Sequence, residues 1–136
     1  PAPDVTAEDR DTVRRLLSAI GTTDELAEEA QIDLMTALPG SGAAYPALMA
    51  VAMAGFMRDQ GVEDAVAWRA AEAAVVGGAQ MLAGRIAEAP QFLAAYRDYR
   101  GTTAAGLDAA EAAGFDDALR RALAAATEAS RRLGQD

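Results

Sequence analysis

The residues best suited to chemistry lie together at Tyr99–Thr103, in the order Tyr-Arg-Gly-Thr-Thr. Two hydroxyls and a row of free backbone N–H groups at the start of a helix, beside an arginine, could bind an anion or a carboxylate. The same residues also suit an ordinary helix cap, because threonine often caps helices. Spacing alone favours the cap.

A second candidate is the glycine-rich run Gly40–Tyr45, which superficially resembles a phosphate-binding loop. A dinucleotide-binding loop has the pattern G-x-G-x-x-G between a strand and a helix. Here Tyr45 stands where the last glycine would be, and we expect no strand before the run. We therefore expect a corner between two helices, with no cofactor bound by this chain.

Several kinds of chemistry are excluded by composition, because the chain has no histidine, cysteine or lysine. Histidine is the commonest general base and metal ligand, and cysteine supplies thiol chemistry. The acidic residues fall mostly at expected helix N-termini or on polar faces, and carboxylate metal sites between helices also use histidine. We expect no metal. The net charge of −9 argues against nucleic acid and anionic membrane as partners.

The expected elements are all helices. Thr6 predicts the cap of the first helix, and Gly21 predicts its end. Residues 22–26 are either extended or a second cap. The predicted helices cover about 7–20, 27–38, 43–59, 64–88, 90–99, from Thr102 or Thr103 to Gly114, and 115–133. The sequence therefore predicts an all-α fold, a helical bundle of six to seven helices.

The stretch that organises these helices runs from Leu34 to Met57 and has no charged residue. It breaks once at Pro39–Gly42 and continues as a helix that is apolar on every side, which must be covered on every side. That helix has only about 15 residues before Arg58, or roughly 22 Å, and a bilayer core is about 30 Å thick. We expect a buried helix covered partly by a second copy of the chain.

No cationic segment followed by an apolar core marks a signal peptide, so we expect a cytoplasmic protein. The sequence begins with Pro1, which fits either loss of an initiator methionine or a piece of a longer protein.

Three segments resemble the pyrroline-5-carboxylate reductase family. Asp33–Tyr45 is similar to that family's D-x-x-T-A-L-S-G-S-G-P-A-Y signature, and Gly77–Leu82 to its G-A-A-K-M-L. Arg100–Leu107, followed by Glu111 and Gly114-Phe115, resembles its G-G-T-T-I-A-G-L, L-E and G-G-F. Order and spacing match over about residues 30–133.

The resemblance implies a C-terminal helical domain that forms an interlocked homodimer and binds a cyclic imine. Residues 27–136 would be this dimerisation and substrate domain, and residues 1–26 would be the last helix and strand of a Rossmann domain. Thr36 would approach the pyrroline ring. Gly101, Thr102 and Thr103 would hold the substrate carboxylate. The full-length protein would reduce the C=N bond with NAD(P)H to give proline, and this chain alone would be inactive.

The resemblance fails at one loop. Asp98, Tyr99 and Arg100 replace the family's S-P-G, which places a negative charge near the expected carboxylate. Two like charges at 4 Å repel by about 1 kcal/mol in water. Arg100 could offset that repulsion by binding the carboxylate through two N–H groups. The alternative is a non-catalytic homodimer that kept the scaffold and lost the reductase site.

Overall fold

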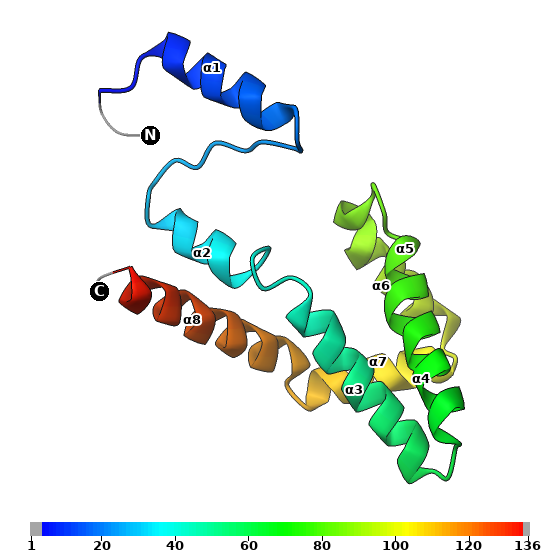
Figure 1. Ribbon diagram of the computed structural model, residues 1–136. Coiled ribbons are helices and arrows are strands. Elements are labelled where there is room, and N and C mark those ends of the chain that lie inside the picture. The colour runs from blue at the N-terminus through cyan, green and yellow to red at the C-terminus, as the bar shows by residue number, and fades with distance from the viewer. Residues whose placement is uncertain (1–3, 135–136) are drawn as a thin grey trace.

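The computed structural model describes residues 4–134, and these residues form helices with no strand (Figure 1). The helices are α1 (Ala7–Ser18), α2 (Gln31–Ala37), α3 (Ala44–Asp59), α4 (Asp64–Glu72), the π-helix η1 (Ala73–Gly77), α5 (Gly78–Gln80), the 3-10 helix η2 (Ile86–Glu88), α6 (Ala89–Tyr99), α7 (Thr102–Ala112) and α8 (Phe115–Leu133). Because α4, η1 and α5 form one continuous run, the described residues hold seven α-helical rods. The all-α prediction is confirmed. Pro1, at the start of the predicted segment 1–26, and the end of the predicted segment 27–136 lie outside the described residues.

Local sequence accounts for several helix ends. Thr6 caps α1 in a reciprocal capping box with Asp9, as predicted. The Thr6 hydroxyl donates to Asp9 Oδ2 at 2.6 Å, and this bond lowers the pKa of Asp9. Gly114 takes a left-handed φ of 78° and separates α7 from α8. The expected boundaries of α3 and α8 are therefore confirmed to within a residue.

Two predicted helices are wrong in extent. The one expected over 27–38 begins only at Gln31, because the Gln31 side chain accepts from the Glu28 N–H at 3.2 Å and stabilises a turn instead. The one expected over 64–88 ends at Gln80, and it widens into a π-helix that ends at Gly77. Gly84 then turns the chain with φ of 74°. Residues 22–26 are irregular, and Glu25 in that segment is ion-paired to Arg10 and Arg14.

The helices pack as pairs, without one shared core. α3 packs on α4 and η1, α2 packs on α8, and α6 packs on α7. α7 also adjoins α8 across the Gly114 corner, and α1 packs on none of the other helices. Figure 1 shows the result, an open arrangement with α1 set apart from the rest. A single copy of the chain therefore leaves most helix faces without a neighbour.

The one sizeable core cluster lies where α3 crosses α4. Ala54 and Ala67 are completely buried there and Ala71 nearly so, with Met57 and Val62 packed against them. Alanine at the crossing lets the two backbones approach closely. Gly61, with φ of 83°, makes the turn between the helices. Arg58 fastens this corner, because it pairs with Asp64 at 3.2 Å and lies 5.6 Å from the centre of the Trp68 ring.

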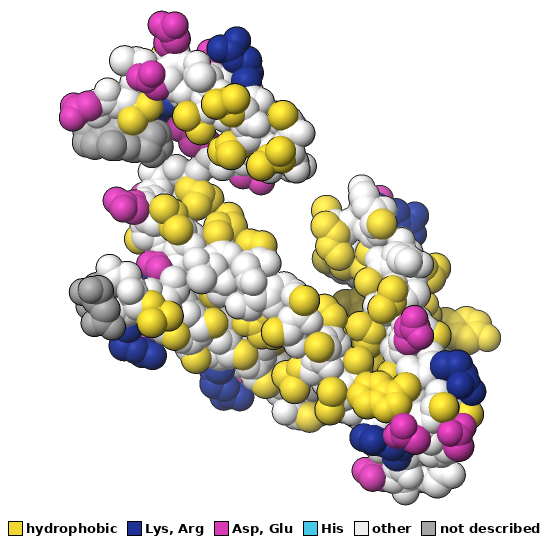
Figure 2. Space-filling model, in the orientation of Figure 1, with side chains coloured by type: hydrophobic (Ala, Val, Ile, Leu, Met, Phe, Trp, Pro, Cys, Tyr) yellow, Lys and Arg dark blue, Asp and Glu magenta, His cyan; other side chains and the backbone are white. Residues whose placement is uncertain are grey.

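Most large apolar side chains remain exposed. The chain exposes 10585 Å² of surface, whereas a compact monomer of 14.0 kDa is expected to expose about 6,700 Å². Figure 2 shows hydrophobic side chains over α1 and over α3 and α4. On α3 the exposed apolar residues include Leu48, Val51 and Phe56. None of the described helices is both long and apolar enough to cross a membrane. The uncovered apolar surface supports association with another copy.

Candidate functional site

The turn from α6 to α7 carries five of the six predicted site residues, Asp98, Arg100, Gly101, Thr102 and Thr103. Arg100 ends α6 in the left-handed conformation, with φ of 53°, and its N–H donates to the Arg97 carbonyl at 3.0 Å. Gly101 is extended and is the N-cap of α7. The structure therefore brings these five residues together in one exposed turn.

The predicted threonine cap is wrong. α7 begins at Thr102, one residue after Gly101, and its N-terminus has no side-chain cap. Glycine has no oxygen to offer, so the first N–H groups of α7 lack an internal partner. Thr102 and Thr103 are both exposed, whereas Ala104 behind them is buried. The N-terminus of α7 thus keeps free donors and two hydroxyls, which suits an anionic ligand.

Arg97, near the end of α6, links α6 to α7 through two ion pairs. Its guanidinium lies 3.5 Å from Asp108 Oδ1 and also pairs with Glu111, so that one α6 side chain holds two acids on α7. Arg97 and both acids are more than 40% exposed, so solvent weakens each pair. The pairs nevertheless fix the rotation of α6 against α7. Sequence reasoning missed Arg97, because its partners lie 11 and 14 residues away on another helix.

Tyr99 and Asp98 complete the turn. A Cβ placed on Gly101 would lie 3.0 Å from Tyr99 Cδ1, so the tyrosine ring rests against Gly101 at the entrance to α7. Asp98 is exposed and forms no ion pair or hydrogen bond with the other described residues. The turn therefore places the negative Asp98, the positive Arg100 and the aromatic ring of Tyr99 close to the free N–H groups.

The left-handed Arg100 gives a testable consequence for stability. Replacing Arg100 by glycine should stabilise the fold by about 1 kcal/mol, because a non-glycine side chain is strained at positive φ. The expected readout is a rise in Tm of about 3 °C. Arg100→Ala is the matched control, since it removes the guanidinium and keeps the strained Cβ. Equal Tm values for the two variants would show that backbone strain contributes nothing.

The sixth predicted residue, Thr36, lies on α2 just before the corner at Pro39–Gly42. Its hydroxyl donates to the Ile32 carbonyl at 3.1 Å, and its own carbonyl accepts from Ser41 Oγ at 3.3 Å. A Cβ on Gly40 would lie 2.6 Å from the Thr36 carbonyl oxygen, so only glycine fits there. The side chain of Thr36 is exposed.

The corner after Thr36 is a helix–helix turn, as predicted. Its N–H groups at Gly40, Gly42 and Ala44 donate to the carbonyls of Met35, Pro39 and Ser41, at 2.9, 3.1 and 2.9 Å. Tyr45 Oη donates to the Ala37 carbonyl at 3.3 Å. Because three N–H groups of the run are occupied by nearby carbonyls, they are not free to bind a phosphate. Gly40 lets the corner pack closely against α2, and Gly42 lets it pass close to the Pro39 carbonyl.

Thr36 and the α6–α7 turn do not meet within one protomer. Among residues 4–134, α2 packs on α8 alone, and it contacts neither α6 nor α7. The same residues contain no group of three or more acidic side chains placed to hold a metal ion. The predicted site is therefore present in two separate parts.

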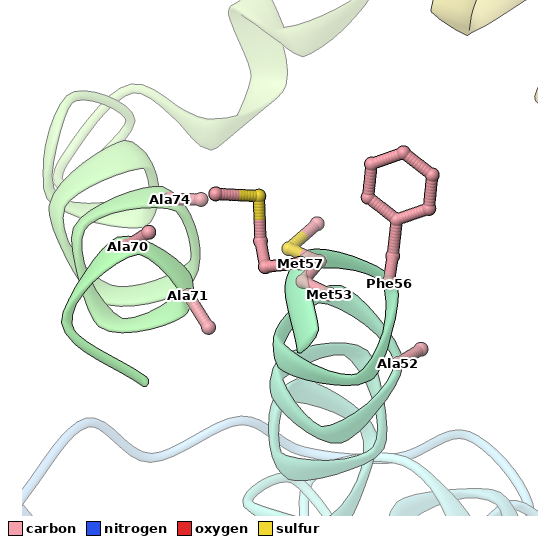
Figure 3. A pocket seen from close by; sticks show the side chains of 7 residues that line it. All are labelled: Ala52, Met53, Phe56, Met57, Ala70, Ala71 and Ala74. Carbon is pink, nitrogen blue, oxygen red and sulfur yellow. The ribbon is translucent and has the colours of Figure 1, made fainter. Parts of the chain in front are cut away.

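A third feature is an apolar groove of about 420 Å³ between α3 and the α4–η1 run. It is lined by Ala52, Met53, Phe56, Met57, Ala70, Ala71 and Ala74. Figure 3 shows Met57 reaching from α3 toward Ala74, while Phe56 projects from α3 on the open side. Because the side chains that line it are all apolar, this groove suits packing and supplies no side chain for catalysis.

Comparison with known proteins settles the family. The sequence model described as pyrroline-5-carboxylate reductase dimerisation matches residues 29–133, which is most of the chain. The chain belongs to this family. The match covers α2 to α8 and leaves α1 outside it.

Individual relatives agree with the family match. The chain is 34% identical over 131 residues to the pyrroline-5-carboxylate reductase of Pseudomonas aeruginosa, covering 96% of this chain and 48% of that protein. It is also 34% identical over 131 residues to the enzyme of Corynebacterium melassecola, with the same coverage of 96% and 48%. The chain thus spans about half the length of these relatives.

Solved structures show the same fold. The pyrroline-5-carboxylate reductase of Coxiella burnetii matches with a TM-score of 0.76 at 25% identity, over 96% of this chain and 48% of that one. The Plasmodium falciparum pyrroline carboxylate reductase, a crystal structure with NADP bound, matches with a TM-score of 0.76 at 23% identity, over 98% and 55%. The family is defined by dimerisation, which supports self-association of this chain.

Proposed function

We propose that this dimerisation domain is the substrate-binding half of an NAD(P)H-dependent enzyme that reduces the C=N bond of a cyclic imine carboxylate. Pyrroline-5-carboxylate, which would give proline, is the substrate that the family name indicates. The observation that carries the proposal is the uncapped N-terminus of α7 in a chain of this family. NAD(P)H would supply the hydride, and the residues of this chain would bind and orient the imine.

The substrate carboxylate would bind at Gly101–Thr103. Backbone N–H groups and the Thr103 hydroxyl would donate to its oxygens, and the positive end of the α7 dipole would add to the attraction. Asp98 would repel the carboxylate, and Arg100 would offset that repulsion. With these two charged residues at the turn, the affinity would depend more strongly on the charge of the substrate than it would with neutral residues at positions 98 and 100.

Thr36 would act on the ring nitrogen. Its proton is already donated to the Ile32 carbonyl, so its lone pairs face outward as acceptors. An acceptor there would hold an N–H group on the ring and so favour the protonated imine, which is the better hydride acceptor. Thr36 would then be an orienting group, with no covalent role.

The two parts of the site would meet through a second copy. Within one protomer α2 and α7 have no contact, so the α2 of one copy would face the α6–α7 turn of the other. Such an exchange would also cover exposed apolar residues on α3. An interlocked dimer would therefore join the two parts of the proposed site.

Residues 1–26 would belong to the cofactor-binding part. Val13, Leu16, Leu17 and Ile20 form an exposed apolar stripe on α1, and α1 packs on no other described helix. We propose that this stripe covers a Rossmann-type sheet in the complete protein. Glu25 pairs with Arg10 and Arg14 of α1 at N–O distances of 3.3 and 3.1 Å. These pairs hold Glu25 beside α1, where a last strand would follow.

Activity tests this proposal directly. Protein from the complete reading frame should oxidise NADPH or NADH in the presence of pyrroline-5-carboxylate, and Thr103→Ala should lower kcat/KM about tenfold, because one hydrogen bond to a charged group is lost. The loss should be mainly in KM. Following cofactor absorbance at several imine concentrations gives both constants.

Thr12→Ala is the control, because it removes an exposed hydroxyl on α1, and α1 contacts neither α2 nor the α6–α7 turn within residues 4–134. That variant should keep wild-type constants. If the wild-type protein reduces no cyclic imine with either nucleotide, the proposed function is wrong.

A further inference from the structure

The position of α2 depends on a single neighbour. This helix has only seven residues, and its N-cap, Ala30, offers no side-chain hydrogen bond. So short a helix is not stable alone. Among the described residues its one packing partner is α8, and Ala37 and Thr127 are the buried residues of the two helices. Whatever holds α8 against α2 therefore sets where α2 lies.

A polar contact joins the two helices at their far ends. Ser130 Oγ, near the end of α8, donates to Asp33 Oδ1 at 2.7 Å, across 97 residues of sequence. Arg131 Nε lies 3.8 Å from the other oxygen, Oδ2. The Asp33 side chain is 25% exposed, the lowest value among the ion-paired carboxylates of residues 4–134. Asp33 is therefore held by α8, and the bond is partly shielded from water.

Asp33 lies one turn before Thr36. Residues three apart lie on the same side of a helix, so a rotation of α2 that breaks the Asp33 contact would also move the Thr36 hydroxyl. The corner would move with it, because Ser41 Oγ donates to the Thr36 carbonyl at 3.3 Å. The contact at Asp33 thus fixes both the direction of the Thr36 side chain and the start of α3.

We propose that Asp33 is a positioning residue, which holds the Thr36 hydroxyl in place through its bonds to Ser130 and Arg131. The inference rests on the role that we propose for Thr36 under the proposed function. Asp33 itself touches neither substrate nor cofactor. An acid near a helix N-terminus also interacts favourably with the helix dipole. That interaction alone does not account for the bond from Ser130 to Asp33.

Amide hydrogen exchange tests whether Asp33 holds α2 in place, and it does so without measuring activity. In protein from the complete reading frame, Asp33→Ala and Ser130→Ala should each speed exchange at residues 34–38 by about tenfold or more. Ser130→Thr keeps the hydroxyl and should restore slow exchange. Arg120→Gln, which breaks an exposed pair with Asp116 on the same helix, is the control and should change nothing. Unchanged exchange in both alanine variants would overturn the proposal.

Kinetics test the link to Thr36. Asp33→Ala should lower kcat about tenfold in the wild-type background and less than about twofold in the Thr36→Val background, because the hydroxyl that it positions is then absent. A general loss of folded protein would lower kcat equally in both backgrounds, and that result would overturn the positioning role. A wild-type protein without imine reductase activity would refute the proposed function, and the exchange experiment would still decide whether Asp33 holds α2.

Discussion

Replacing Phe56 by aspartate should convert the protein from dimer to monomer at micromolar concentration. Phe56 is 64% exposed in one protomer and lies at the edge of the groove between α3 and α4. A two-fold symmetric interface contains this residue twice, so the effect counts twice. Loss of a buried phenyl ring and burial of a carboxylate together cost about 6 kcal/mol for the pair, or about 10⁴-fold in Kd.

Light scattering coupled to size exclusion measures the mass of the species in solution. Leu16→Asp is the matched control, because Leu16 is 68% exposed on α1 and lies outside residues 29–133, the part that matches the dimerisation family. This control should remain dimeric. A Phe56→Asp variant that still runs as a dimer at micromolar concentration would place the interface on another face of the protein.

Replacing Ala67 by leucine should destabilise the α3–α4 pair by about 3 kcal/mol. Ala67 and Ala54 are completely buried at the crossing, so a larger side chain must push the two helices apart or adopt a strained rotamer. The Arg58–Trp68 contact at the same corner should loosen as well. Denaturant unfolding followed by fluorescence of Trp68, the one tryptophan, reports the loss.

The control for this variant is Ala65→Leu, which makes the same substitution at an exposed position of α4. It should change the free energy of unfolding by less than about 0.5 kcal/mol, because surface substitutions in a helix cost little. Equal losses for Ala65→Leu and Ala67→Leu would mean that the crossing is not close-packed.

Sequence reasoning succeeded where the signal is local. The Thr6 capping box, Gly114 before α8 and the corner at Pro39–Gly42 each follow from a few neighbouring residues. The prediction that α3 needs outside cover also followed from its composition alone. These features depend on conformational preferences that act within a few residues of the chain.

The sequence-based predictions failed where neighbouring residues allow more than one structure, or where the partner residue is distant in sequence. Residues 81–88 favour a helix locally, and only Gly84 indicates that the run 64–88 breaks there. The cap of α7 could have been glycine or threonine, because both occur at that position in proteins. The bond from Ser130 to Asp33 spans 97 residues, so no local pattern in the sequence predicts it.

The 97 residues between Asp33 and Ser130 also determine when α2 can pack during synthesis. Ribosomes add about 5 to 20 residues per second, so the last turn of α8 is synthesised about 5 to 20 s after Asp33, which lies 97 residues earlier. Until then α2 lacks α8, its one packing partner among residues 4–134, and the apolar side chains of α3 have already been translated and are uncovered. The nascent polypeptide is therefore vulnerable to aggregation until α8 packs on α2 and a second copy covers the apolar residues of α3.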